Sequence, residues 1–161
     1  MALVFIGLGS NLGNGRINLT EAWKYLGRHP KITPLTLSSP YLSEPVGIVT
    51  THWFTNAVGA LETRLNPEEL LVELLKIEKE MGRNRLSGQD RAIDLDILYY
   101  DDLLLCSSTL EIPHPELHKR LFVLAPLEEL SPDHIHPASL LSSRSMRQTL
   151  KADYKVIKTT W

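Results

Sequence analysis

The fold is decided at Asn66-Pro67-Glu68-Glu69-Leu70-Leu71-Val72-Glu73-Leu74-Leu75, where a strand pattern has just ended and a helix begins. The Asn66 side chain can cap a helix N-terminus, Pro67 suits the first helical position, and Glu69 completes a capping box. Apolar residues then recur at the spacing of one helix face as far as Gly82, and a glycine is typical of a helix end. The sequence therefore predicts a helix that ends at Gly82.

Outward from this helix, the predicted elements follow the order β-α-β-β-α-β. They are a strand over Leu3 to Leu8, a helix over Arg16 to Leu26 with Gly27 as its C-terminal glycine, strands over Ile32 to Tyr41 and Phe54 to Thr63, the helix just described, and a strand over Ala92 to Leu98 extended by Tyr99 and Tyr100. This order matches the ferredoxin-like βαββαβ sandwich, an α+β fold with helices packed on a mainly antiparallel sheet. The other face of the sheet then needs loops and C-terminal elements to cover it, among them a short helix near residues 122–130, or it is a binding surface.

Composition limits the classes of protein that fit. The 161 residues, 43% hydrophobic and 22% charged, amount to about one globular domain, so we expect a single domain over residues 1–161. No apolar run approaches the ~18 residues of a membrane span, and the apolar N-terminus lacks a basic leader, which indicates a strand. The single cysteine, Cys106, excludes an internal disulfide and fits a cytoplasmic location. A net charge of −2 gives no global case for a nucleic-acid partner, and we expect a monomer without an obligate protein partner.

The sharpest chemical signal is the run Ile93-Asp94-Leu95-Asp96-Ile97. Because side chains alternate along a strand, Asp94 and Asp96 project from one face while their apolar neighbours point into the core. Two adjacent carboxylates repel each other, and such a pair of hard oxygen ligands suits Mg²⁺. The alternative is a pair of solvated carboxylates on an open strand face.

Three arginines, Arg83, Arg85 and Arg91, lie just before this pair. Guanidinium groups bind phosphate oxygens through two parallel hydrogen bonds. Arginines beside two carboxylates provide both halves of a magnesium–polyphosphate site, whereas the alternative is a network of surface salt bridges. The two features together favour a site that handles phosphate.

Two further residues are candidates for ligand contacts. Glu78 lies within the apolar stripe of its helix, where it either extends to the helix end or accepts hydrogen bonds from a ligand at the sheet edge. His114 lies between two prolines in a stiff turn, where packing is the alternative role. His134 and His136 lack further ligands at metal spacing, so no zinc site is expected.

The glycines after the first strand do not form a dinucleotide-binding motif. Gly7, Gly9 and Gly13 have the spacing G-x-G-x-x-x-G, and the next strand is expected to be antiparallel. The P-loop pattern G-x-x-x-x-G-K-[ST] is absent from the sequence as well. Any nucleotide must therefore be held by side chains.

Several motifs occur in a fixed order along about the first four-fifths of the chain. They are Gly9-Ser10-Asn11-Leu12-Gly13, Asn56-Ala57, Glu78 with Gly82-Arg83, the run from Arg91 to Ile97, and Pro113-His114 with Arg120 and Phe122. The set resembles the 6-hydroxymethyl-7,8-dihydropterin pyrophosphokinase family. The resemblance implies a ferredoxin-like fold and an ATP-dependent transferase. That enzyme moves pyrophosphate to the hydroxymethyl group of the pterin, giving AMP and a diphosphate ester used in folate synthesis.

The resemblance also implies a role for each matching residue at the phosphate end. Asp94 and Asp96 are expected to hold two Mg²⁺ ions that bridge the phosphates of the co-substrate ATP. Arg83 and Arg91 resemble arginines that close on the polyphosphate, and with the two aspartates they form the expected catalytic set. The other expected ATP contacts are Glu78, Arg85, Ile97, His114 and Arg120.

At the pterin end, the resemblance implies that the heterocycle stacks between Phe54 and Phe122 while Asn56 hydrogen-bonds its amide edge. The backbone near Ser43, Val46 and Gly47 is expected to complete the pocket. Without the resemblance, the alternative for the two phenylalanines is plain core packing.

The sequence departs from the family pattern in the loop over residues 86–90. It lacks the tryptophan, the neighbouring arginine and the proline that usually precede the last arginine in the family, so the resemblance implies that this loop is not expected to close over the pterin in the family's way. Two other hypotheses stay open: a non-catalytic ferredoxin-like module that binds RNA or a small molecule, and an inactive family member. Acidic residues at positions 94 and 96 disfavour stacking of RNA bases, and retention of Arg83, Arg91 and both aspartates disfavours the inactive member.

Overall fold

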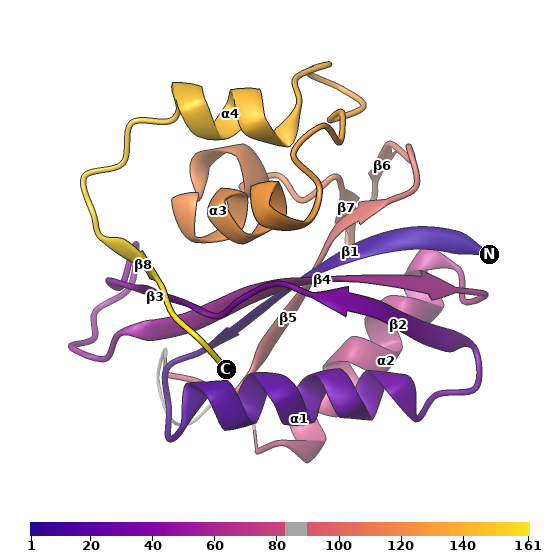
Figure 1. The fold of residues 1–161 in the computed structure, drawn as a ribbon. Coiled ribbons are helices and arrows are strands. Elements are labelled where there is room, and N and C mark those ends of the chain that lie inside the picture. Colours follow the sequence, from indigo (N-terminus) through magenta and orange to yellow (C-terminus); the bar gives the residue numbers. More distant parts are fainter. Residues whose placement is uncertain (83–89) are drawn as a thin grey trace.

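The computed structural model describes residues 1–82 and 90–161. Its strands are β1 (Ala2–Ser10), β2 (Ile32–Leu37), β3 (Tyr41–Ser43), β4 (Phe54–Thr63), β5 (Asp94–Tyr100), β6 (Leu105–Cys106), β7 (Glu111–Ile112) and β8 (Val156–Lys158). Its helices are α1 (Gly15–Gly27), α2 (Pro67–Glu80), α3 (Leu121–Leu130) and α4 (Ser143–Thr149), with a 3₁₀ helix, η2 (Leu117–Lys119). Figure 1 shows a central sheet with α1 and α2 on one face and α3 and α4 on the other.

The sheet is antiparallel and runs in the order β5-β1-β4-β3-β8, while β2 pairs with β4 beside β3. β1 is an inner strand: it pairs with β4 from Ala2↔Thr63 to Ser10↔Thr55 and with the edge strand β5 on its other side. The order β1-α1-β2-β4-α2-β5 confirms the predicted ferredoxin-like βαββαβ arrangement. β3 and the C-terminal elements are added to this frame.

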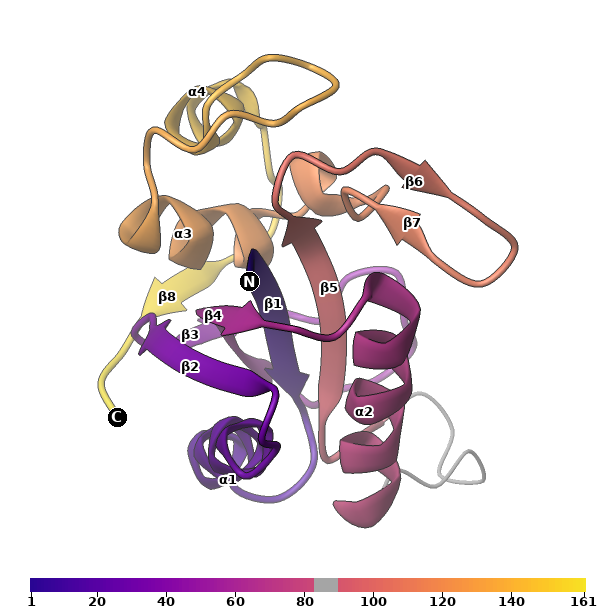
Figure 2. The ribbon, with the colours of Figure 1, turned by 90° about the vertical axis from the view of Figure 1, so that its right-hand side faces the viewer.

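Alternation along the strands divides the buried side chains into two cores. Val4, Ile6 and Leu8 of β1 pack with α1 and α2, whereas Phe5 points to the opposite face. On that second face Leu124 belongs to a core built with α3 and α4. C-terminal elements therefore cover the second face, one of the two outcomes that the sequence allowed, and Figure 2 shows α3 lying across the strands there.

The predicted helix start is confirmed in detail. The Asn66 side chain accepts a hydrogen bond from the Glu69 backbone N–H at 2.8 Å, and the Glu69 carboxylate accepts one from the Asn66 N–H at 2.9 Å. Gly82 follows the helix with φ of +89°, a left-handed conformation that favours glycine. Local sequence signals are sufficient here because every partner lies within one helical turn.

Two local predictions are wrong. The expected strand over Ile32 to Tyr41 is interrupted at Ser38, so that β2 and β3 pair with successive parts of β4. Ser38 bridges the interruption, because its N–H donates to the Val58 carbonyl and its hydroxyl accepts from the Val58 N–H. Gly27 lies inside α1 rather than after it, and the capping residue Arg28 keeps a right-handed helical conformation.

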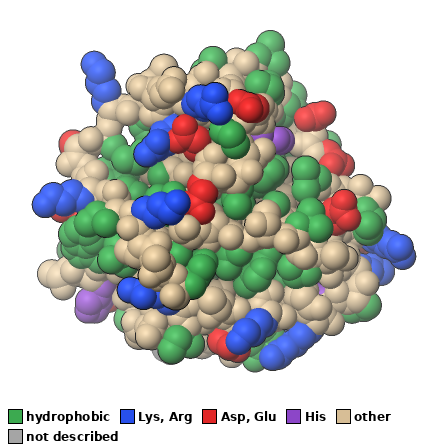
Figure 3. Space-filling view, viewed as in Figure 1, with side chains coloured by type: hydrophobic (Ala, Val, Ile, Leu, Met, Phe, Trp, Pro, Cys, Tyr) green, Lys and Arg blue, Asp and Glu red, His purple; other side chains and the backbone are tan. Residues whose placement is uncertain are grey.

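The surface over α3 and α4 carries basic and acidic side chains next to one another (Figure 3). Arg147 of α4 and Glu128 of α3 are joined at 2.6 Å, which ties the two helices together. Among the helices of residues 1–82 and 90–161, none is long and apolar enough to cross a membrane.

Candidate active site

A cavity of about 160 Å³ opens on the α3 face of the sheet. Its walls come from β1, β4 and β5, the loop that follows β3, and the start of α3. Gly7 and Gly9 lie in the floor, where a Cβ at position 9 would approach the Asn56 side-chain oxygen to 3.4 Å. The cavity brings together ten of the residues selected from the sequence: Ser43, Val46, Phe54, Asn56, Arg91, Asp94, Asp96, His114, Arg120 and Phe122.

The two aspartates lie on one face of β5, as alternation predicts. Both are partly exposed and line the cavity, whereas Leu95 and Ile97 between and after them are buried on the opposite face. Asp94 Oδ2 forms an ion pair with Arg91 Nη1 at 3.0 Å. Arg91 is therefore a cationic partner of the carboxylate pair, and both carboxylates still line the cavity.

The Asp96 carboxyl is the most strongly perturbed acid of the cavity. Burial, then the neighbouring Asp94 carboxylate, raises the pKa of Asp96 to about 6, although Arg120 and Arg91 act in the opposite direction. The ionised form of Asp96 is therefore disfavoured in the folded protein, and a cation bound at the two carboxylates would favour it. Hard carboxylate oxygens are the ligands that Mg²⁺ prefers, so the donor chemistry fits this ion.

Protein side chains alone do not enclose a metal here. Among the described residues, no group of three or more His, Cys, Asp or Glu side chains is arranged to hold a metal ion. Mg²⁺ is commonly bound by one or two carboxylates together with substrate phosphates and water. Two aspartates at the edge of a cavity suit that mode of binding better than a preformed metal cage.

Arg91 is held in place by Asn11, which follows β1. The Arg91 N–H donates to Asn11 Oδ1 at 2.8 Å, and the Asn11 N–H donates to the Arg91 carbonyl at 3.1 Å. Asn11 Nδ2 also donates to Asp90 Oδ1 at 2.7 Å, and Asp90 Oδ2 contacts His52 Nδ1 at 2.9 Å. Hydrogen bonds, first from Thr50 and then from His52 and Asn11, lower the pKa of Asp90. Asn11 was present in the motif quoted from the sequence, but its positioning of Arg91 becomes visible only in three dimensions.

His114 presents a nitrogen to the carboxylates. Its Nδ1 accepts a hydrogen bond from the Glu116 N–H at 3.1 Å, so in the neutral ring Nε2 carries the proton. Nε2 lies 3.8 Å from Asp96 Oδ2. Burial, and then the Arg120 charge, lowers the pKa of His114, so the ring is a neutral donor at neutral pH.

Two aromatic rings and a buried amide also line the cavity. Phe54 and Phe122 both line it, and the Arg120 guanidinium carbon lies 5.8 Å from the centre of the Phe122 ring. Asn56 is buried and donates through Nδ2 to Ser43 Oγ at 2.8 Å. This contact fixes the amide orientation and leaves Oδ1 as the acceptor near the cavity floor.

Some selected residues do not line the cavity. Glu78, only 2% exposed, accepts a hydrogen bond from the Leu95 N–H at 2.8 Å and so holds the outer edge of β5. Ile97 is buried in the core shared with α1 and α2, and Gly47 has φ of +72° in the loop after β3. Arg83 and Arg85 lie outside the described residues.

Sequence reasoning missed several lining residues. They include Glu44, Ile48, Leu98 and Val123. Glu44 adjoins the selected Ser43, and Leu98 continues the alternation of Asp94 and Asp96 along β5, so a stricter application of the strand period identifies Leu98. Ile48 and Val123 carry no local signal, since a loop and a helix bring them to the cavity.

An α+β fold whose cavity combines paired carboxylates, arginines and an aromatic slot defines a transferase of the phosphate-handling class. The model of the family described as 7,8-dihydro-6-hydroxymethylpterin-pyrophosphokinase (HPPK) matches residues 5–132. The chain belongs to this family, which confirms the resemblance found in the sequence.

Named relatives agree with the family model. A Haemophilus influenzae protein named 2-amino-4-hydroxy-6-hydroxymethyldihydropteridine pyrophosphokinase is 39% identical over 159 residues, covering 98% of each chain. An Aquifex aeolicus protein of the same name is 40% identical over 138 residues, covering 85% of each.

Solved structures share the fold. Plasmodium falciparum wild-type HPPK-DHPS with pteroate superposes with a TM-score of 0.75 at 14% identity, covering 91% of this chain and 44% of the other. A crystal structure of HPPK-DHPS in complex with substrates gives a TM-score of 0.75 at 15% identity, with coverage of 92% and 43%. The chain thus spans less than half the length of these solved chains, and the likeness is one of fold.

Proposed function

We propose that this protein transfers pyrophosphate from ATP to the hydroxymethyl group of 6-hydroxymethyl-7,8-dihydropterin, giving AMP and the pterin diphosphate. The observation that carries the proposal is one cavity that combines two chemically different sets of side chains. Carboxylates and arginines form one set, and two phenylalanine rings with the Asn56 amide form the other. Family membership supplies the two substrates that such a cavity accommodates.

In the proposed reaction the hydroxymethyl oxygen attacks the β-phosphorus of ATP. A bond forms between that oxygen and the β-phosphorus, and the bond from the β-phosphorus to the bridging oxygen of the α-phosphate breaks. AMP leaves with the bonding electron pair, and the hydroxyl proton passes to water or to the Asp96 carboxylate. Transfers of this kind depend chiefly on alignment and on stabilisation of charge, so the main task of the protein is to position its substrates.

At the pterin end, we assign stacking to Phe54 and Phe122 and recognition of the amide edge to Asn56. The Ser43 hydroxyl supports this assignment because it accepts the Asn56 N–H and keeps the amide in one orientation. Backbone near Val46 and Gly47 completes the proposed pterin site.

At the phosphate end, Arg91 and Arg120 neutralise the developing charge, and the His114 Nε2–H donates to a phosphate oxygen. Asp94 and Asp96 would hold two Mg²⁺ ions, which supply charge neutralisation and polarise the phosphate oxygens. The fixed backbone of Arg91, held by Asn11, keeps the guanidinium beside the aspartates. The proposed roles of Arg83, Arg85, Glu78 and Ile97 in ATP binding remain predictions.

The proposal is tested by measuring AMP release from Mg-ATP with and without the reduced pterin. AMP that forms only with the pterin supports pyrophosphate transfer, because an ordinary kinase or ATPase gives ADP. Formation of ADP overturns the reaction but keeps a phosphate site. Pterin binding without nucleotide turnover supports the inactive family member, and binding of RNA with neither activity supports the non-catalytic module.

Three wider statements complete the proposal. The chain acts as one catalytic domain over residues 1–161, it is a monomer, and it works in the cytoplasm. Sedimentation equilibrium measures the monomer directly, and activity of the purified chain alone tests whether it needs a protein partner.

A further inference from the structure

The C-terminal segment, residues 154–161, lies beyond the part of the chain that the family model matches. It returns from α4 across the molecule and adds β8 to the outer edge of β3, as the yellow strand in Figure 1 shows. β3 ends at Ser43, which lines the cavity. The last residues of the chain are therefore attached to a wall of the candidate active site.

The segment forms two hydrogen bonds with Glu44, a residue that lines the cavity. The Glu44 N–H donates to the Lys155 carbonyl at 3.1 Å, and the Lys155 N–H donates to the Glu44 carboxylate at 2.7 Å. β8 then pairs with β3 through Ser43↔Val156, Leu42↔Ile157 and Tyr41↔Lys158. Both Ser43 and Glu44 line the cavity, so this pairing fixes the backbone of two lining residues.

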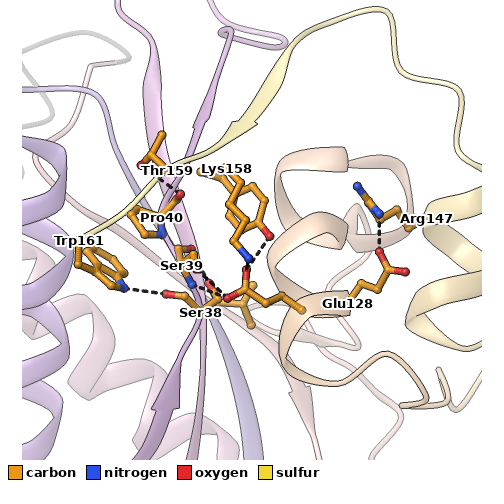
Figure 4. Close-up of polar contacts among 11 residues, drawn as sticks. Ser38, Ser39, Pro40, Glu128, Arg147, Lys158, Thr159 and Trp161 are labelled. Atoms are coloured by element: carbon orange, nitrogen blue, oxygen red, sulfur yellow. Dashed lines mark hydrogen bonds and ion pairs between the residues drawn. The ribbon is translucent and has the colours of Figure 1, made fainter.

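A second group of contacts anchors the end of the segment (Figure 4). The Thr159 N–H donates to the Pro40 carbonyl at 2.8 Å, and Trp161 Nε1 donates to the Ser38 carbonyl at 3.0 Å. Lys158 Nζ lies 3.3 Å from Glu129 Oε2, so the segment is also tied to α3. These contacts hold residues 38–40, immediately before β3. They also fix the C-terminal residues, for which the sequence alone suggested no role.

β3 also supports Asn56, the residue assigned to the amide edge of the pterin. Asn56 Nδ2 donates to Ser43 Oγ at 2.8 Å, with a longer contact of 3.4 Å to the Tyr41 carbonyl. Both acceptors belong to β3, whose outer neighbour is β8. Loosening β8 therefore loosens the support that orients the Asn56 amide.

The same segment supports the opposite wall. The Tyr154 hydroxyl accepts a hydrogen bond from the Leu121 N–H at 2.7 Å, which satisfies a free donor at the start of α3. The Tyr154 ring lies 6.2 Å from the ring of Phe122, the next residue of the helix. The N-cap residue of α3, Arg120, forms no capping hydrogen bond through its side chain. The Tyr154 hydroxyl, 33 residues after Leu121, caps the helix in its place.

We propose that residues 154–161 are a positioning segment for the reduced-pterin half of the site, acting on Asn56 through β3 and on Phe122 through Tyr154. The inference rests on the proposed function and deepens it, since it identifies a specificity device outside the residues that the family model matches. The segment contacts β3 and the start of α3, whereas the aspartates come from β5, which β3, β4 and β1 separate from β8 in the sheet. Weakening β8 alone should therefore affect the pterin and not ATP, whereas Tyr154 also supports the backbone next to Arg120.

The first test weakens β8 without removing a core side chain. The N–H groups of Lys155 and Thr159 point toward β3 and the residues that flank it. Because N–H directions alternate along a strand, the Ile157 N–H also points toward β3, and the Val156 N–H points toward the open edge of the sheet. Ile157→Pro removes a bond of the β3–β8 pairing, whereas Val156→Pro introduces the same ring at a position whose N–H is not used. We expect Ile157→Pro to raise the KM for the pterin about tenfold, with the KM for ATP unchanged and the control close to wild type.

The second test removes one oxygen atom. Tyr154→Phe deletes the acceptor for the Leu121 N–H and keeps the ring, and Tyr25→Phe on α1 is the matched control far from the cavity. We expect Tyr154→Phe to raise the pterin KM at least threefold, with the folded fraction measured by circular dichroism unchanged. An unchanged pterin KM in both Ile157→Pro and Tyr154→Phe overturns the inference. So does a fall in kcat that follows the folded fraction with both KM values constant, because a purely structural role predicts that result.

Pterin binding, followed by its fluorescence in the presence of Mg²⁺ and a non-hydrolysable ATP analogue, distinguishes failure of the inference from failure of the proposed function. A wild-type chain that binds the pterin but forms no AMP contradicts the function, and the variants still test the inference through their dissociation constants. A wild-type chain that binds no reduced pterin overturns both.

Discussion

Replacing Asp96 with asparagine is expected to stabilise the free protein while it abolishes pyrophosphate transfer. Burial and the Asp94 charge raise the pKa of Asp96 from 3.8 to about 6, so ionising this carboxyl costs more in the folded chain than in the unfolded chain. A shift of this size corresponds to about 3 kcal/mol at ~1.4 kcal/mol per pKa unit. Because 39% of the side chain is exposed, solvent screens part of the cost, and we expect a gain of about 1–1.5 kcal/mol at pH 8.

The pH dependence of this gain has a defined sign. Above the folded-state pKa of about 6, Asp96 is charged in both states and wild-type protein bears the full cost. As the pH falls toward 3.8, the folded protein takes up the proton before the unfolded chain does, so the cost is removed. The wild type and the asparagine variant should therefore converge in stability as the pH falls toward 4, although they differ at pH 8.

Urea unfolding followed by tryptophan fluorescence, without divalent ions, measures the effect at pH 8 and at pH 5. Asp102→Asn is the matched control, because Asp102 is exposed in the turn after β5 and its replacement should change stability by less than about 0.5 kcal/mol. Added Mg²⁺ should stabilise wild type and not the Asp96 variant. An Asp96 variant that is less stable than wild type at pH 8, or whose difference from wild type does not depend on pH, refutes the electrostatic account of the site.

Three further substitutions test other parts of the structure. Arg91→Ala should lower kcat about 100-fold while the KM for ATP changes less than threefold, and steady-state kinetics would reveal the opposite pattern if the arginine only bound ATP. Asn11→Ala removes the two side-chain hydrogen bonds to the Arg91 N–H and the Asp90 carboxylate and keeps the backbone bond to the Arg91 carbonyl, so it should lower kcat about tenfold and stability by about 1–3 kcal/mol in urea unfolding, and full activity contradicts the positioning of Arg91. Gly59→Ala places a Cβ in steric conflict with the Trp23 ring, and thermal unfolding should show a loss of about 1–3 kcal/mol; an unchanged midpoint means that the indole moves aside freely.

The amino-acid sequence by itself determined those features whose causes lie within a few residues. The capping box at Asn66 forms because its partners are three residues apart, and Asp94 and Asp96 share a face because a strand alternates. The chain order of strands and helices, together with the motifs, was sufficient to predict the fold and the family. The resemblance also predicted ten of the cavity residues.

Tertiary structure decided what depends on contacts between distant parts of the chain. Asn11 and Arg91 are 80 residues apart, and no local pattern indicates that one holds the other. Glu44 and Lys155, 111 residues apart, meet only because β8 adds to the edge of β3 after the rest of the sheet is in place. The break at Ser38 has the same origin, since β4 offers one edge to two short strands. Hydrophobic periodicity and helix capping depend on residues a few positions apart, so the sequence shows them directly. Strand pairing and the walls of a cavity depend on contacts between distant residues, which form only when the chain folds.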